Sequence, residues 1–270
     1  MDLILLLKAF IQGLVEGATE FLPISSTGHL IIVGDLLKFN DDKAKVFDIV
    51  IQLAAILAVC WEYRRKLLDT ALNLTQQNIA QKNVAQHFTL NLLIAFLPAA
   101  LLGLAFHSSI KTYLFSPLTV AMALIVGGIA ILVIERLPLQ ANTSSIDDMS
   151  HKQALQIGLA QALALIPGVS RAGATILGGM LFGLKRQTAT EFSFFLAIPI
   201  MFAATGYDLL KSWKLLSADD LAMFAVGFVT AFVSALIAIK FLLRFVASHD
   251  FKIFAWYRIA LGLLVLAYFQ

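Results

Sequence analysis

The chain has 270 residues, of which 60% are hydrophobic and only 14% are charged, and its mean hydropathy is +0.86. A charged fraction so far below the roughly 25% of soluble domains predicts an integral membrane protein. The net charge of +3 and the pI near 9.0 then reflect basic loops facing lipid headgroups, so we expect membrane lipids and no nucleic acid as partners.

The first apolar region, residues 3–38, is interrupted near its middle by Pro23 and by polar residues, and residues 153–184 are interrupted in the same way. The halves of both regions run about 12–20 residues, and several are too short to cross a hydrocarbon core about 30 Å thick. Six uninterrupted runs of about 17–21 residues match the roughly 20 that a spanning helix needs. These runs are residues 46–62, 88–106, 118–134, 190–210, 221–240 and 253–269.

The two interrupted regions resemble each other. A shift of 145 residues lays Glu16 on Gln161 and residues 24–28 on residues 169–173. If each region is a re-entrant hairpin, three spans follow each one, and the two halves of the chain have opposite orientations. Two such hairpins meet near the midplane, where irregular backbone is tolerated when protein encloses it or when it lines a wet cavity.

The expected fold is therefore an all-α integral membrane protein with six transmembrane helices and two re-entrant helical hairpins. No linker or low-complexity tract divides the chain, so residues 1–270 are expected to form one domain. Within it, the inverted-topology repeats cover approximately residues 1–135 and 150–270. Lys and Arg are more frequent on the side that carries residues 64–66, which predicts a cytoplasmic location for that side and an outward location for both termini.

The first interruption carries two carboxylates. Glu16 and Glu20 are spaced i, i+4 and share one helix face, and Gly13 and Gly17 beside them allow another backbone to approach closely. The pair can bind a divalent cation such as Mg²⁺ through oxygen, or one carboxylate can act as a general base. The alternative is a pair of helix-end carboxylates in headgroup water.

Hydroxyls and an imidazole follow Pro23 at the start of the next half-helix, in the run Ser25-Ser-Thr-Gly-His29. A helix start offers backbone N–H groups to an anion, and a Ser or His near a carboxylate can act as a nucleophile. Taken alone, the Ser-Ser-Thr run is more typical of an ordinary N-cap than of a catalytic site, and it is the neighbouring residues that favour catalysis.

The second interruption supplies a cation in Pro167-Gly-Val-Ser-Arg-Ala-Gly-Ala-Thr175. Arg171 is a lone basic residue in a long apolar region, and a buried guanidinium is a bidentate clamp for phosphate or carboxylate. The alternative is an internal ion pair with Glu16 or Glu20, which is compatible with a clamp that opens when substrate arrives. The sequence leaves Arg258 and Glu191 undecided between helix-end anchors and groups that support the site.

These motifs resemble the bacterial undecaprenyl-diphosphate phosphatases associated with bacitracin resistance. Glu16-x-x-x-Glu20 with Ser25-Ser-Thr-Gly-His29 is similar to the first motif of that family, and Pro167-Gly-x-Ser-Arg-x-Gly-x-Thr175 is similar to the second. The similarity covers essentially the whole chain. One departure is Ala172, where the family often carries Ser, so this chain has no side-chain hydroxyl at that position.

The resemblance implies hydrolysis of undecaprenyl diphosphate to undecaprenyl phosphate and inorganic phosphate, which recycles the lipid carrier of cell-wall synthesis. It implies a multi-pass protein of the bacterial plasma membrane, with an active site open to the outer, periplasmic face, and it suggests a homodimer. A polyanionic head on a long apolar tail also requires a polar cavity inside a lipid-accessible bundle, in which positioning and charge neutralisation carry phosphoryl transfer.

The same reasoning gives the expected roles of the residues. Arg171 holds the phosphates, while Glu16 and Glu20 bind a divalent cation, Mg²⁺ or Ca²⁺, or activate the nucleophile. Ser26 is the preferred nucleophile with His29 as general acid and base, and the reverse assignment to His29 stays open. The expected substrate contacts are Ser25, Thr27, Gly168, Ser170, Gly173 and Thr175.

A transporter is the main alternative, because inverted repeats, broken helices and midplane charges are typical of transporters as well. The concentration of Ser, His, two Glu and Arg favours an enzyme, since anion binding needs fewer reactive groups. A phosphatidic-acid-type phosphatase is disfavoured, because the sequence lacks a second His in a matching motif.

Overall fold

Helices form nearly all of the regular structure. The computed structural model describes residues 3–76, 78–212 and 220–269. These residues contain one isolated β-bridge, between Thr143 and Leu184, and no β-strand. The α-helices are α1 (Leu3–Thr19), α2 (Ser26–Leu36), α3 (Asp42–Glu62), α4 (Arg64–Thr75), α5 (Ile79–Ser109), α6 (Pro117–Ile134), α7 (His151–Ala162), α8 (Arg171–Leu181), α9 (Arg186–Ser212), α10 (Leu221–Val246) and α11 (Lys252–Phe269). Short turns of other helix types lie at η1 (Ile110–Leu114), η2 (Ile146–Asp148) and η3 (Leu163–Leu165).

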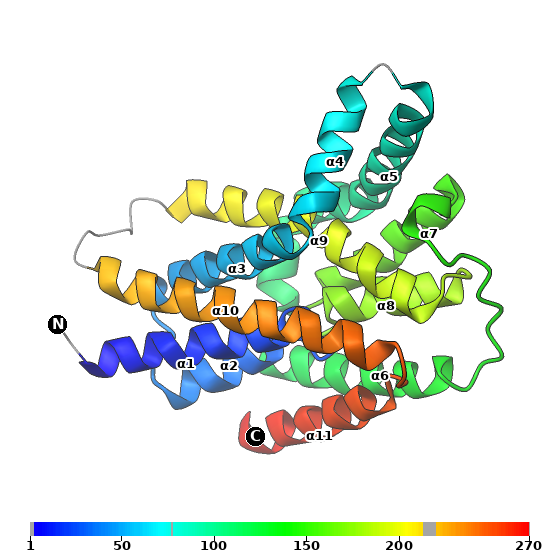
Figure 1. Ribbon diagram of the computed structural model, residues 1–270. Helices are drawn as coiled ribbons and strands as arrows, with labels where there is room; N and C mark the ends of the chain where they lie inside the picture. The colour runs from blue at the N-terminus through cyan, green and yellow to red at the C-terminus, as the bar shows by residue number, and fades with distance from the viewer. Residues whose placement is uncertain (1–2, 77, 213–219, 270) are drawn as a thin grey trace.

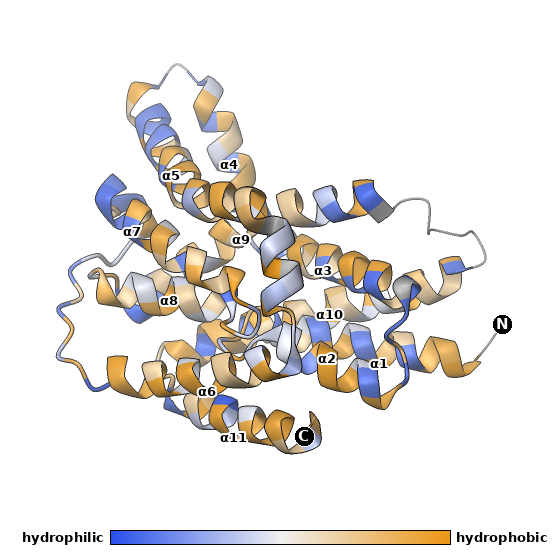
Figure 2. Ribbon diagram, turned by 180° about the vertical axis from the view of Figure 1, so that it is seen from behind, coloured by the Kyte–Doolittle hydropathy of each residue, from blue (hydrophilic) through white to orange (hydrophobic). Residues whose placement is uncertain are grey.

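Six helices in the described part of the chain are long and apolar enough to cross a membrane. They are Lys43–Glu62, Ile79–Phe106, Pro117–Ile134, Arg186–Lys211, Leu221–Val246 and Lys252–Phe269. Each contains one of the predicted runs, so the prediction of an all-α integral membrane protein with six spans is confirmed. Hydrophilic residues gather at the α4–α5 end and at the start of α7, while the long helices are mostly hydrophobic (Figure 2).

The interrupted regions fold as two helical hairpins, α1–α2 and α7–α8 (Figure 1). Lys8 Nζ donates to the Lys38 carbonyl at 3.3 Å, which places the start of α1 beside the end of α2. In the second hairpin, Gln153 Nε2 donates to the Phe182 carbonyl at 2.9 Å and joins the start of α7 to the end of α8. Each hairpin therefore begins and ends on one side of the molecule.

The hairpins open at opposite ends of the bundle. The α3 helix begins at the open end of the first hairpin and runs away from it to Glu62. Beyond that far end, Lys66 pairs with Asp147 at 2.7 Å, just before α7 begins. The closed tips of the two hairpins consequently point towards each other in the interior.

Glycines bring the first hairpin against α10. A Cβ on Gly13 would lie 2.5 Å from the Gly227 carbonyl oxygen, and one on Gly17 would overlap Ser234 Oγ and the Ala231 carbonyl. Ser234 Oγ also donates to the Gly13 carbonyl at 3.3 Å. The predicted close backbone approach at Gly13 and Gly17 is confirmed, and it fixes the position of Glu16 and Glu20 on the same helix.

Local sequence signals explain where other helices begin. Asp41 caps α3 by accepting from the Ala44 amide at 2.8 Å, and Ser150 forms a capping box with Gln153 at the start of α7. At α6, Pro117 occupies the first turn, where its missing N–H costs no helical bond.

Candidate active site

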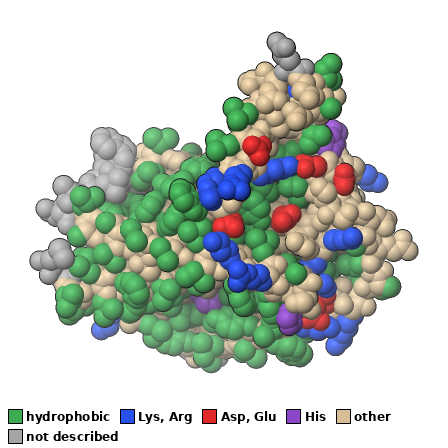
Figure 3. Space-filling view, viewed as in Figure 1, with side chains coloured by type: hydrophobic (Ala, Val, Ile, Leu, Met, Phe, Trp, Pro, Cys, Tyr) green, Lys and Arg blue, Asp and Glu red, His purple; other side chains and the backbone are tan. Residues whose placement is uncertain are grey.

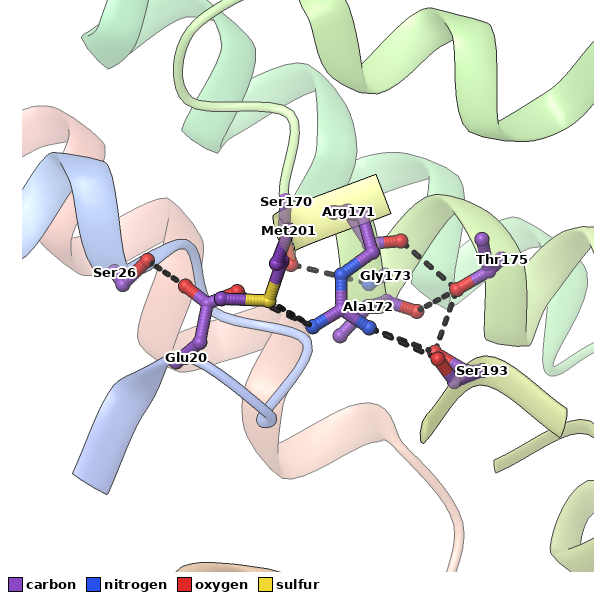
Figure 4. Close-up of polar contacts among 9 residues, drawn as sticks. All are labelled: Glu20, Ser26, Ser170, Arg171, Ala172, Gly173, Thr175, Ser193 and Met201. Carbon is purple, nitrogen blue, oxygen red and sulfur yellow. Dashed lines mark hydrogen bonds and ion pairs between the residues drawn. The ribbon is translucent and has the colours of Figure 1, made fainter. Parts of the chain in front are cut away.

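The tips of the two hairpins meet through an ion pair. Arg171, the first residue of α8, places Nη2 3.2 Å from Glu20 Oε1, which follows α1 (Figure 4). The Arg171 side chain is 13% exposed and that of Glu20 is 10% exposed, so water screens the pair little. Of the two readings of Arg171, the free protein therefore forms the internal ion pair, and its partner is Glu20.

Ser26 extends this pair into a chain of three groups. Its hydroxyl donates to Glu20 Oε2 at 2.5 Å, so the carboxylate accepts from Arg171 with one oxygen and from Ser26 with the other. Glu20, Ser26 and Arg171 all line a cavity of about 260 Å³ between the hairpin tips, α3 and α9. Ser25, Thr27, Gly168 and Ser170 line it too, with Gln52 of α3 and Thr205 of α9.

The guanidinium of Arg171 is held from behind by α9. Its Nη1 donates to the Ser193 carbonyl at 3.0 Å, and the Ser193 hydroxyl lies 2.6 Å from Thr175 Oγ1 (Figure 4). Thr175 is buried and does not line the cavity: its hydroxyl donates to the Arg171 carbonyl at 2.9 Å, and it reaches the guanidinium only through Ser193. A planar cation fixed on one edge presents its other edge to Glu20, or to an anion in that place.

The turns into α2 and α8 have the same unusual backbone. Ser25 has φ 70° and Ser170 has φ 73°, positions that correspond under the shift of 145 residues, and both fall in the left-handed region that L-residues rarely adopt. Ser170 Oγ accepts from the Gly173 amide at 3.0 Å, so in the free protein this pair forms an N-cap. Strained backbone of this kind is typical of functional loops.

Both ring nitrogens of His29 are hydrogen-bonded to groups other than the Ser26 hydroxyl. Its Nδ1 lies 2.7 Å from the Ser25 carbonyl oxygen and its Nε2 lies 2.7 Å from the hydroxyl of Tyr257 in α11. The imidazole is also stacked on the Tyr257 ring, and it does not line the cavity. Sequence reasoning puts Ser26 and His29 together, whereas the structure puts Glu20 beside Ser26.

Glu16 is fully buried and lies outside the cavity lining. Among the residues that the structure describes, neither of its carboxylate oxygens has a hydrogen-bond partner, and the same holds for Oδ1 of Asp48, a neighbouring carboxylate on α3. Unpartnered buried oxygens are costly, so these two carboxylates fit a hard cation better than the oxygens of Glu20, which are already bonded. Among the described residues, no three His, Cys, Asp or Glu side chains gather in a metal-binding arrangement.

Arg258 of α11 connects both hairpin tips. All five of its N–H groups donate to backbone carbonyls at 2.9–3.3 Å, and the side chain is almost completely buried. Three of the carbonyls belong to the tips and two to α6: Pro23, Gly168, Val169, Ala123 and Leu124. Arg258 is therefore an interior support of the site and not a helix-end anchor.

The other residue that the sequence leaves undecided, Glu191, lies in α9 outside the cavity lining. Asp48, Ser193 and Tyr257 are further groups around the site that the motifs do not reveal. Each is a polar side chain within a largely apolar spanning helix, and that is the signal by which all three can be found.

Comparisons with known proteins agree with these motifs. The model of the family described as bacitracin resistance protein BacA matches residues 9–264. The chain is 64% identical to an undecaprenyl-diphosphatase of Methylobacillus flagellatus, with 100% of both chains covered. It is 62% identical to undecaprenyl-diphosphatases of Nitrosospira multiformis and Nitrosomonas europaea, covering 98% of this chain and 96% and 95% of theirs. The chain belongs to the bacitracin resistance protein BacA family.

Proposed function

We propose that this protein is an undecaprenyl-diphosphate phosphatase, which hydrolyses its lipid substrate to undecaprenyl phosphate and inorganic phosphate. The observation that carries the proposal is the bonded chain of Arg171, Glu20 and Ser26 in a cavity between two hairpin tips. Relatives at 57–64% identity bear the corresponding name. The reaction recycles the lipid carrier of cell-wall synthesis and, by consuming the diphosphate, confers bacitracin resistance.

Substrate binding uses Arg171 as a clamp. A diphosphate oxygen takes the place of Glu20 Oε1 on Nη2, while the contact with Ser193 keeps the guanidinium oriented. Ser25, Thr27, Gly168 and the backbone N–H groups at the starts of α2 and α8 line the phosphate site. Ser170, Gly173 and Thr175 support it, the first two as the N-cap of α8 and Thr175 through Ser193.

Ser26 is the nucleophile in this proposal. Its Oγ forms a bond to the terminal phosphorus while the bond from that phosphorus to the bridging oxygen breaks, and undecaprenyl phosphate leaves with the electron pair. The Ser26 proton passes to Glu20 Oε2, with which it is already hydrogen-bonded. Water then hydrolyses the phosphoserine, inorganic phosphate leaves, and Ser26 recovers its proton.

His29 has a different place in this scheme from the one that the motif implies. Its hydrogen bonds to the Ser25 carbonyl and to the Tyr257 hydroxyl suit a side chain that orients the loop before α2. In this position the imidazole can also exchange protons at the edge of this loop. The reverse assignment, with His29 as nucleophile, requires the ring to give up one of these hydrogen bonds before it reaches phosphorus.

A divalent cation, Mg²⁺ or Ca²⁺, is part of the proposal. Glu16 and Glu20 are the ligands expected from the sequence, and Asp48 adds an unpartnered oxygen near Glu16. When bound, such a cation neutralises charge on phosphate oxygens. Glu16 would hold the cation, while Glu20 orients Ser26 whether or not the cation is bound.

We also propose the membrane arrangement. The two hairpins are re-entrant in the bacterial plasma membrane, the repeats of approximately 1–135 and 150–270 are inverted, and the cavity opens to the periplasmic face. The excess of Lys and Arg at the end that carries residues 64–66 supports a cytoplasmic location for that end. A homodimer is the proposed assembly, on the family resemblance alone.

The test is phosphate release from undecaprenyl diphosphate by purified protein in detergent, with EDTA and after addition of Mg²⁺ or Ca²⁺. We expect release that stops with EDTA and returns with a divalent ion, and that falls at least 100-fold in Arg171→Gln. Lys152→Gln, an exposed change of the same charge, is the control. Binding of the lipid without release under any divalent ion would refute the phosphatase and favour the transporter.

A further inference from the structure

Two open hollows lie side by side at the basic end of the bundle and share Lys240. The first, of about 510 Å³, lies between the start of α4 and α10 and is lined by Glu62, Tyr63, Arg64, Arg65, Lys66 and Lys240. The second, of about 500 Å³, lies along the C-terminal part of α10 and is largely apolar. Lys and Arg side chains gather where α4 leaves the bundle and over the end of α10 (Figure 3).

The charges in these hollows are unequally compensated. Lys66 pairs with Asp147 at 2.7 Å, and Lys240 reaches Glu62 only at 3.7 Å while remaining 56% exposed. Across the part of the chain that the structure describes, the side chains of Arg65 and Arg244 form no hydrogen bond or ion pair, and both residues are exposed. Two unengaged guanidiniums flank Lys240, and guanidiniums suit phosphate oxygens.

An apolar strip continues from these cations along α10. Val229, Val233, Ile237 and Phe241 are spaced by four residues, share one helix face and are 49–65% exposed. At 1.5 Å per residue the strip is about 18 Å long. One leaflet of a core about 30 Å thick is about 15 Å deep, so the strip matches the depth of a single leaflet.

We infer that Arg65, Lys240 and Arg244, with the strip Val229–Phe241, form a binding site for an anionic phospholipid of the surrounding bilayer. The phosphate lies between the three cations at the interface, and one acyl chain lies along the strip. Basic groups beside a spanning helix on the cytoplasmic side are the usual recognition elements for acidic headgroups. None of its residues lines the cavity between the hairpin tips, so it does not depend on the proposed phosphatase activity.

The test is native mass spectrometry of the detergent-solubilised protein with phosphatidylglycerol, phosphatidylcholine or inorganic phosphate. Wild type is expected to bind phosphatidylglycerol with a Kd at least tenfold below that for phosphatidylcholine. The triple variant Arg65→Gln, Lys240→Gln, Arg244→Gln loses this preference. A matched triple variant at the same end, Lys82→Gln, Arg136→Gln, Lys152→Gln, removes equal charge from one half-buried and two exposed positions and keeps the preference.

Three results would overturn the inference. The first is equal binding of both lipids by wild type, and the second is an equal loss of the preference for phosphatidylglycerol in both triple variants. The third is displacement of phosphatidylglycerol by inorganic phosphate alone, which would leave the apolar strip without a role. If the first triple variant does not fold, the single variants Arg244→Gln and Arg136→Gln give the same comparison. Arg244→Gln is expected to raise the Kd for phosphatidylglycerol about threefold, and Arg136→Gln is expected to leave it unchanged.

Discussion

Replacing Arg258 by lysine tests how the two hairpin tips are held together. Arginine supplies five N–H donors here, and all five are bonded to backbone carbonyls. Lysine keeps the charge but has three donors, so at least two of the five carbonyls lose their partner. Three of these carbonyls lie in the loops that carry Pro23, Gly168 and Val169, where no helix supplies another donor.

The expected magnitude follows from that count. A hydrogen bond to a charged group contributes about 1.5–3 kcal/mol, so the loss of two lowers the free energy of unfolding by about 3 kcal/mol at the low end of this range. Against a total of about 5–15 kcal/mol this is a large change. The tips carry Glu20, Ser26 and Arg171, so folded Arg258→Lys protein is also expected to have a kcat about tenfold lower than wild type, because these groups are displaced.

The assay is equilibrium unfolding in mixed dodecylmaltoside and SDS micelles, together with phosphate release at a temperature at which the variant is folded. Arg244→Lys is the matched control, since Arg244 is exposed and its side chain forms no hydrogen bond to the described residues. If Arg258→Lys and Arg244→Lys changed stability and kcat equally little, the claim that Arg258 holds the hairpin tips would be wrong.

Three further predictions concern single contacts. Gly17→Ala places a Cβ against Ser234 Oγ and the Ala231 carbonyl and is expected to lower the free energy of unfolding by about 1–3 kcal/mol. Gly206→Ala is expected to cost nothing, because among the described residues no atom outside the adjoining helix backbone lies within 4 Å of the new Cβ; equal stabilities of the two variants would contradict the close packing of α1 on α10. Tyr257→Phe keeps the ring stacked on His29 but removes the hydroxyl, and steady-state kinetics should show kcat lowered about tenfold with KM unchanged. A changed KM with normal kcat would instead give His29 a role in substrate binding. Ser193→Ala removes the hydroxyl that joins Thr175 to the support of the Arg171 guanidinium, and KM for the lipid diphosphate should rise about fivefold. Ser248→Ala, in the exposed turn after α10, should not produce this change.

Much of the fold follows from the sequence because membrane helices have strict length and composition requirements. The six spans lie where the apolar runs predict them, and the positions of Pro23 and Pro167 mark the two breaks. The sequence does not predict α4 and the early part of α5, because this helical pair is polar and projects from the bundle (Figure 1). An amphipathic surface helix carries a weaker signal than a spanning one.

The candidate site is predictable in its residue types and less so in its contacts. Glu20, Ser26 and Arg171 stand in the two motifs and meet at the hairpin tips. The partner of His29 lies in α11, more than 200 positions along the chain, so no local spacing predicts that contact. Which carboxylate meets Arg171 is likewise decided by the packing of α1 on α10. The re-entrant insertion and the inverted repeat stay predictions.

The most direct test of the central claim separates binding from chemistry at Ser26. Undecaprenyl diphosphate binding and phosphate release are measured for wild type, Ser26→Ala and, as control, the exposed Ser248→Ala. The account predicts that Ser26→Ala binds the lipid within about threefold of wild type and releases phosphate at least 1,000-fold more slowly, since only the attacking oxygen is lost. Release by Ser26→Ala within tenfold of wild type would contradict it.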